Sequence, residues 1–315
     1  MVSLLSGVFL GWSLGANDAS NVFGSAVSAR MLRFWTAALL ASGFVILGSL
    51  LEGQAGIETL QNITPMGLKE AAVSSLAAAA TVTLMTFARL PVSTSQAVVG
   101  AILGIAVLNR ELNAPNLSKI VACWIGTPIG GMLIAMVLYR LSALVYNNLS
   151  MNLFQSDSLL RLSLIAAGSY GAYALGANNV ANVTAVFVAA DQLTVFSAVL
   201  VGGLSIALGI MTFSRRVMET VGRRLVRLDP FSALMVVMAE AITVHIYTFV
   251  GVPVSTSQAV VGAVLGIGII KGIKTVAPRT LVNILLGWCL TPLAAMIMAI
   301  GIYFAIHLQY ISPSP

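Results

Sequence analysis

The sequence has few charged residues and few cysteines, and both shortages restrict what the protein can be. Only 8% of its 315 residues are charged, whereas a soluble domain carries about 25%, so a soluble fold is excluded. The two cysteines, Cys123 and Cys289, each lie beside a tryptophan in an apolar run, and we interpret them as packing residues rather than a disulfide or metal site. Aromatic and basic residues are not interleaved as a base-stacking surface requires, so no nucleic-acid partner is expected.

Long apolar runs are what the sequence has instead. Hydrophobic residues make up 58% of the chain, and the mean hydropathy is +0.98. Several runs are long enough to cross about 30 Å of hydrocarbon as helices, among them Phe34–Leu51, Ala71–Ala88, Leu193–Phe213 and Leu281–Ile306. The composition therefore predicts an all-α, polytopic protein of the cell membrane, and of the inner membrane if the source is bacterial.

Two motifs occur twice, in the same order. The segment PVSTSQAVVGAILGI recurs 162 residues later as PVSTSQAVVGAVLGI. GANDASN, from Gly15, recurs 161 residues later as GANNVAN, from Gly176. Repetition at a nearly constant separation predicts two copies of one transmembrane repeat, residues 1–147 and 148–315.

Equivalent segments of the two repeats carry opposite charge. Glu52–Glu70 contains three glutamates and one lysine, whereas Ser214–Pro230, which we expect to be the equivalent loop, contains five arginines. Basic loops remain cytoplasmic, so the first segment is predicted outside and the second inside. The repeats would then have inverted topology with both termini outside, which is a plan found in secondary transporters.

Both PVSTSQ segments are expected to begin helices. Ser93, Thr94 and Ser95 follow a proline and precede an apolar run, and such hydroxyl residues cap helix N-termini. We expect each segment to form the tip of a re-entrant hairpin, with the two hairpins entering from opposite faces. Two helix N-termini that meet inside the protein would offer N–H groups to an anion.

The Gly-Ala-Asn motifs place polar side chains where lipid would otherwise be expected. We expect Gly15 and Gly176 to break their helices. Asp18 has no basic neighbour in sequence, and a lone carboxylate in a membrane is costly and usually functional. Amide and carboxylate oxygens would suit Na⁺, so the motifs predict a cation bound beside an oxyanion.

The two Gly-Ala-Asn motifs and the doubled PVSTSQ resemble the signatures of the inorganic phosphate transporter family, the Pit-type permeases. The resemblance covers nearly the whole chain and implies cation-coupled phosphate uptake through inverted repeats, with substrate held at the hairpin tips and helix breaks. One departure is Asn179, where the eukaryotic pattern often has a second aspartate, which leaves the number of coupled cations open.

The motifs and the resemblance together give two sets of candidate ligands. The candidate phosphate ligands are Asp18, Asn21, Ser93, Thr94, Ser95, Gln96, Asn182, Ser255, Thr256, Ser257 and Gln258. The candidate Na⁺ ligands are Asn17, Asp18, Ser93, Asn178, Asn179, Ser255, Glu70 and Glu240.

The leading hypothesis is therefore Na⁺-coupled symport of inorganic phosphate, with Na⁺ as the coupling ion and no other cofactor. A proton-coupled permease for phosphate or a metal–phosphate complex, a sulfate permease and an anion channel remain alternatives. An enzyme is not expected, because no nucleophile–base pair or metal cluster is evident. We interpret His245 as a hydrogen-bonded structural residue in preference to a proton carrier. The last span of each repeat is a candidate homodimer surface.

Overall fold

The chain folds entirely into helices and loops over the residues that its structure, a computed structural model, describes: 2–87, 92–224, 228–272 and 278–311. The helices are α1 (Val2–Ser28), α2 (Phe34–Glu52), α3 (Gln54–Gln61), α4 (Leu68–Phe87), α5 (Thr94–Asn109), α6 (Ala114–Asn147), α7 (Leu153–Ala189), α8 (Val195–Arg224), α9 (Pro230–Val250), α10 (Thr256–Lys271) and α11 (Pro278–Ile311). Within these ranges, α2, α4, α6, α8, α9 and α11 are long and apolar enough to cross a membrane. The predicted apolar spans and the all-α polytopic fold are confirmed.

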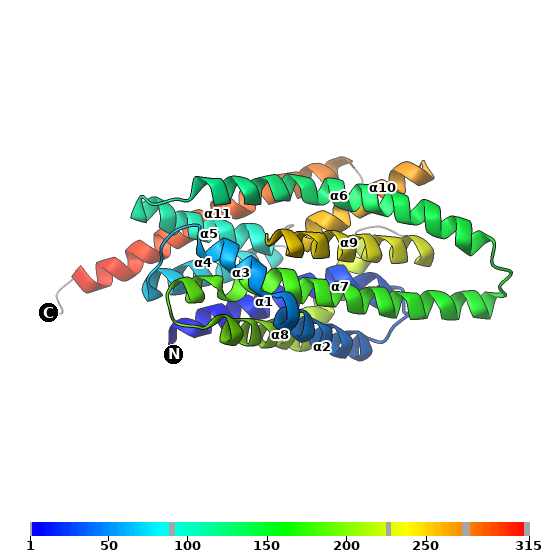
Figure 1. Cartoon of the computed structure of the whole chain (residues 1–315), viewed down its shortest axis with the longest axis horizontal. Helices are drawn as coiled ribbons and strands as arrows, with labels where there is room; N and C mark the ends of the chain where they lie inside the picture. The colour runs from blue at the N-terminus through cyan, green and yellow to red at the C-terminus, as the bar shows by residue number, and fades with distance from the viewer. Residues whose placement is uncertain (1, 88–91, 225–227, 273–277, 312–315) are drawn as a thin grey trace.

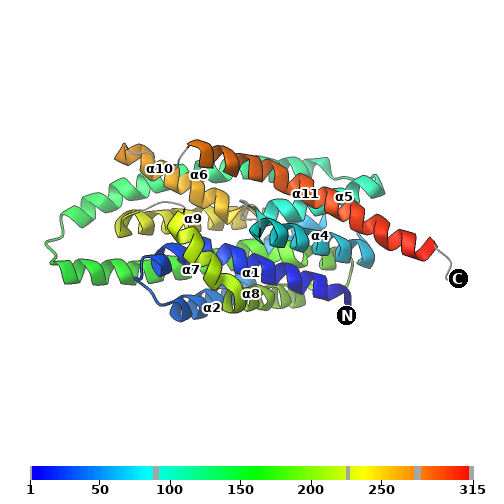
Figure 2. The same ribbon diagram turned by 180° about the vertical axis from the view of Figure 1, so that it is seen from behind.

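The helices lie roughly parallel in one elongated bundle (Figure 1). Helices α6 and α11 run along one side, and α1, α2, α7 and α8 run along the other. The hairpin α4–α5 lies toward the end where α1 starts and α11 finishes, and the hairpin α9–α10 lies toward the opposite end (Figures 1 and 2). The two hairpins therefore reach the middle of the bundle from opposite ends.

Close glycine contacts join the two halves of the chain reciprocally. A Cβ on Gly15 of α1 would lie 2.0 Å from the carbonyl oxygen of Ile206 in α8. A Cβ on Gly176 of α7 would lie 2.0 Å from the carbonyl oxygen of Val45 in α2. Both the glycines and their partners are 161 residues apart in sequence. Each half thus packs its first helix against the second helix of the other half, although the inverted-repeat division itself stays a prediction.

The expected helix breaks at Gly15 and Gly176 are wrong. Helices α1 and α7 run unbroken through the Gly-Ala-Asn motifs. The glycines instead allow two helix backbones to approach more closely than any side chain would permit. The motif side chains are therefore presented from the surface of regular helices.

The helix starts expected at the hairpin tips are confirmed. Ser93 caps α5 and Ser255 caps α10, and in each case the serine oxygen accepts a hydrogen bond at 3.4 Å from the backbone N–H three residues later. The tips meet, because the hydroxyl of Ser95 lies 2.8 Å from the carbonyl oxygen of Val254. Pro91, which begins the first motif, lies outside the described residues.

The basic segment Ser214–Pro230 is not the loop expected, because α8 continues as a helix to Arg224. Met218 is buried on the inner face of this extension while Arg215 and Arg216 stay exposed, so an amphipathic pattern supports the helix. Arg227 lies outside the described residues. The guanidinium of Arg215 lies 5.7 Å from the ring centroid of Phe34, the first residue of α2. The start of α2 and the extension of α8 therefore share one end of the bundle.

An ion pair closes the second hairpin at its outer end. Lys271, the last residue of α10, pairs with Asp229, which caps α9. Partial burial acts to raise the pKa of Asp229, but hydrogen bonds from Lys271 and Ser232 outweigh burial and hold that pKa below its ordinary value.

We predict that the end bearing Arg215 and Arg216 is cytoplasmic and that α3 lies toward the exterior, because basic ends remain inside. After replacement of Cys123 and Cys289 by alanine, a cysteine at Glu58 should react with an impermeant maleimide on intact cells. A cysteine at Arg216 should react only after lysis. Equal reaction of both positions on intact cells would contradict the inverted topology.

Candidate functional site

Ser95 joins both hairpin tips to α7. Its hydroxyl lies 2.8 Å from the carbonyl oxygen of Val254 and 3.1 Å from Oδ1 of Asn179, and can donate to either. It accepts a hydrogen bond at 2.9 Å from Nδ2 of Asn182, which also donates to Asn179 Oδ1 at 2.8 Å. The second amide motif therefore touches the tips of both hairpins at one point.

Asn178 holds the second tip through hydrogen bonds made by both its amide nitrogen and its amide oxygen. Its Nδ2 donates to the carbonyl of Val252 at 3.0 Å and to the Thr248 hydroxyl at 3.3 Å. Its Oδ1 accepts from the backbone N–H of Val254 at 2.8 Å. Asn178 was a candidate Na⁺ ligand, but these contacts give it a structural role in the arrangement observed.

The first amide motif also contacts the tips of both hairpins. Nδ2 of Asn17 donates to Oδ1 of Asp18 at 2.8 Å, and the Asp18 carboxyl also lies near Thr94. Asn21 donates to the hydroxyl of Thr256 at 2.9 Å. Asp18 is buried, and none of the ion pairs formed by the described residues involves it.

Five polar atoms of this cluster are buried without a hydrogen-bond partner in the described part of the chain. They are Thr94 Oγ1, Gln96 Oε1, Asn179 Nδ2, Asn182 Oδ1 and Gln258 Oε1. A buried polar atom without a partner costs about 1–3 kcal/mol. A protein that keeps five of them together, beside a buried carboxylate and two helix N-termini, has the polar lining of a ligand site.

Two serines at the hairpin tips are already engaged as helix caps. Ser93 and Ser255 hold their helix caps, and Ser255 also lies 2.8 Å, oxygen to oxygen, from Ser257. The helices α5 and α10 both begin at these tips, and the first N–H groups of a helix have no partner inside their own helix. Backbone donors therefore add to the side-chain set.

The two candidate glutamates are separated by the fold. Glu240 of α9 is fully buried, neither carboxyl oxygen has a hydrogen-bond partner among the described residues, and it lies close enough to Asp18 to interact electrostatically. Glu70 lies in the first turn of α4, a helix of 20 residues and therefore about 30 Å long, and the tip follows the other end. The structure therefore places Glu70 at the end of α4 that is far from the tip, outside the cluster described above.

Helix α3 contacts the second hairpin tip, which the sequence analysis did not predict. A Cβ on Gly56 would lie 2.9 Å from the Cβ of Ala181 and 3.4 Å from Pro253, so α3 covers the second tip. The signal was present in the apolar pair Ile57 and Leu60, which are three apart and both buried.

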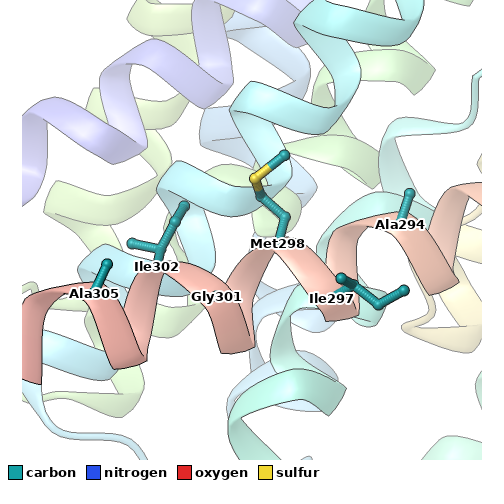
Figure 3. Close-up of a pocket in the computed structure, with 6 residues that line it drawn as sticks. All are labelled: Ala294, Ile297, Met298, Gly301, Ile302 and Ala305. Atoms are coloured by element: carbon teal, nitrogen blue, oxygen red, sulfur yellow. The ribbon is translucent and has the colours of Figure 1, made fainter. Parts of the chain in front are cut away.

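A groove on the outer surface is distinct from this cluster (Figure 3). It runs along α11 and is lined by apolar residues alone: Ala294, Ile297, Met298, Gly301, Ile302 and Ala305. Helices α6 and α11 are the least buried of the candidate spans. Such a surface suits lipid or a second protein, and the homodimer expected at the last spans stays a prediction.

Comparisons with known proteins identify relatives of nearly the whole chain. The sequence model of the Phosphate transporter family matches residues 14–156 and 150–299. The chain is 29% identical to "Putative phosphate permease MJ0630" of Methanocaldococcus jannaschii over 94% of both chains. It is 28% identical to the sulfate permease CysP of Bacillus subtilis, over 94% of this chain and 85% of that protein.

A solved structure described as the sodium-dependent phosphate transporter has the same fold. It matches with a TM-score of 0.84 and 25% sequence identity over 98% of each chain. Together with the family match, this similarity shows that the protein is a multi-pass membrane protein and belongs to the phosphate transporter family.

Proposed function

We propose that this protein is a secondary active transporter that carries inorganic phosphate together with Na⁺. The observation that carries the proposal is the group of five unpartnered polar atoms beside Asp18, between the N-termini of α5 and α10. The free oxygens and the carboxylate are the ligands that Na⁺ prefers. The Asn179 amide, the Thr94 hydroxyl and the helix N–H groups are donors for an oxyanion.

The sulfate permease among the relatives makes sulfate the second candidate. The two anions differ in one chemical respect, because phosphate near neutral pH keeps a proton that it can donate, whereas sulfate has none. The unpartnered oxygens of Gln96, Asn182 and Gln258 are acceptors. An acceptor-rich lining favours the anion that can donate, and this supports phosphate over sulfate.

Uptake of radiolabelled phosphate into proteoliposomes tests the proposal. We expect accumulation driven by an inward Na⁺ gradient at equal pH, and no accumulation from a pH gradient without Na⁺. A tenfold excess of sulfate should leave uptake nearly unchanged. Accumulation from the pH gradient alone would favour the proton-coupled permease, inhibition by sulfate would favour the sulfate permease, and strictly downhill flux would favour a channel.

Thr94→Val should weaken phosphate binding without unfolding the protein. The substitution removes a hydroxyl that lies near the Asp18 carboxyl but has no hydrogen-bond partner of normal geometry among the described residues, so little internal stability is lost. Loss of one ligand hydrogen bond of about 1–2 kcal/mol predicts a roughly tenfold rise in KM for phosphate.

Thr81→Val is the matched control for this substitution. Thr81 is equally buried on α4, and its hydroxyl bonds only the Ala77 carbonyl of its own helix. KM should stay near that of the wild type in Thr81→Val. An equal effect of both substitutions would remove Thr94 from the site.

A further inference from the structure

A second polar cluster lies outside the candidate site, between α2, α7 and α9. Nε2 of His245 lies 2.7 Å from Oε2 of Glu52, and Nδ1 of His245 lies 2.7 Å from the hydroxyl of Tyr170. The rings of Tyr173 and Phe249 lie 5.6 and 4.9 Å from the imidazole, centroid to centroid. The side chains of His245 and Glu52 are only 17% and 31% exposed, so the pair is largely enclosed.

The cluster ties one hairpin to the body of the bundle. His245 lies on α9, the arm that leads to the second tip, while Glu52 ends α2 and Tyr170 lies on α7. Helix α7 packs against both α2 and α9. His245 is one turn before Thr248, which receives a hydrogen bond from Asn178 of the second amide motif. The pair therefore acts on the same arm that the site itself contacts.

The first half of the chain fills the equivalent positions without a charge. The equivalent residues lie 161 or 162 positions away in the sequence. Phe213 is equivalent to Glu52, Thr83 to His245, Phe9 to Tyr170, Trp12 to Tyr173 and Phe87 to Phe249. Trp12 packs against Phe9 and Phe213 with centroids 6.0 and 5.4 Å apart, and Phe87 packs against Phe213 at 6.1 Å. An aromatic cluster is thus sufficient to pack this position, and packing does not explain the ionisable pair in the second half.

We propose that His245 and Glu52 form a proton-binding site whose occupancy holds the second hairpin against α2 and α7. Imidazole is the side chain that changes charge between about pH 5 and 8. When it is protonated, Nε2–H donates a charge-assisted hydrogen bond to the Glu52 carboxylate and the pair has no net charge. When the proton leaves, one negative charge remains largely enclosed, which is unfavourable. Proton binding therefore tightens the contact between α9 and α2, and proton release loosens it.

Among the other ionisable groups of the packed helices, Tyr170 and Tyr173 of α7 contact the pair, and Glu240 of α9 interacts electrostatically with Tyr170. The charged groups of the remaining helices interact elsewhere. Lys119 of α6 donates to the Val250 carbonyl, Glu58 of α3 accepts from Gln54, Asp18 of α1 lies near Glu240, and Lys271 of α10 pairs with Asp229 at the outer end.

The sequence makes the proton directly observable, because it contains only two histidines, His245 and His307. In protein labelled with ¹⁵N at histidine alone, His307→Gln assigns the two sets of imidazole signals. The ¹⁵N signals of the ring report how many of its nitrogens carry a proton. We expect the His245 spectrum to differ between pH 5.5 and pH 8 in the wild type, and this difference to change in Glu52→Gln, where the hydrogen-bond acceptor has no charge. A His245 spectrum that is identical at the two pH values would overturn the proposal.

The effect on the hairpin can be measured without any transported anion. Spin labels on Leu47 of α2 and Ile246 of α9, which are both exposed, report the separation of the two helices in Na⁺ buffer free of phosphate. We expect a narrow distance distribution at pH 5.5 and a longer, broader one at pH 8. The difference should vanish in both Glu52→Gln and His245→Gln and persist in His307→Gln.

A distance distribution that does not change with pH in the wild-type background would overturn the proposal. The same pH dependence in Glu52→Gln and His245→Gln would overturn it equally. Neither measurement requires uptake, so these outcomes are separate from any failure of the proposed Na⁺–phosphate symport.

Discussion

Asp18→Asn should lower the apparent affinity for Na⁺ by roughly tenfold or more, and phosphate affinity should fall with it. The carboxylate is buried among amides and hydroxyls and takes part in none of the ion pairs of the described residues. At an effective dielectric constant of about 20, a unit charge about 4 Å away contributes about 4 kcal/mol, of which the amide oxygen retains a part. Because linkage is reciprocal, weaker Na⁺ binding also weakens phosphate binding.

Calorimetric titration of Na⁺ into purified protein, with and without phosphate, measures both effects. Asp157→Asn is the matched control, because Asp157 is exposed and pairs only with Arg161 one turn away on α7. It should bind Na⁺ and phosphate as the wild type does. Wild-type Na⁺ affinity in Asp18→Asn would remove this carboxylate from the cation site and put the proton-coupled permease first.

Gly176→Ala should destabilise the whole protein severely, and Gly15→Ala should do the same. The new Cβ of either alanine would lie 2.0 Å from a backbone carbonyl oxygen of the neighbouring helix. No flexible side chain can move aside, so the two helices must separate. Overpacking of a core costs about 1–3 kcal/mol when side chains adjust, and a clash with backbone is expected at or above the upper end of that range.

Gly43→Ala tests whether the destabilisation expected in Gly15→Ala and Gly176→Ala comes from the backbone clash or from the loss of a glycine. Gly43 also lies inside a helix, α2, but nothing would lie within 4 Å of its new Cβ. Alanine there should leave the Tm in detergent unchanged or raise it slightly, because alanine favours helix by up to about 1 kcal/mol. If Gly15→Ala and Gly176→Ala melt at the same temperature as Gly43→Ala, the reciprocal packing described above is not important for stability.

The parts of the fold that were predictable are those that local chemistry decides. The apolar runs predict the spans because their length must match the bilayer, and the hydroxyl residues after Val92 and Val254 predict caps because the first N–H groups of a helix need an acceptor. The polar clusters near the tips were predictable for the same reason, since amides and acids are costly in lipid.

The parts that were not predictable depend on what lies opposite each residue. A glycine that breaks a helix and one that admits a neighbouring helix have the same sequence signal, and only the position of Ile206 or Val45 distinguishes them. The position of Glu70 was not predictable for a different reason, because it precedes the tip in sequence but is separated from it by the full length of α4. The pairing of Glu52 with His245 joins residues 193 positions apart, and nothing in either local segment indicates it.

The reciprocal contact between α1 and α8 also determines how the protein must be made. Gly15 and its partner Ile206 are separated by 190 intervening residues. At about 5–20 residues per second, the ribosome needs roughly 10–40 s to synthesise that interval. During this time α1 holds Asp18 and two asparagines with neither α8 nor the second hairpin available to cover them. The first helix of the nascent chain must therefore wait beside the insertion machinery, or in a temporary pairing, until the second half has entered the membrane.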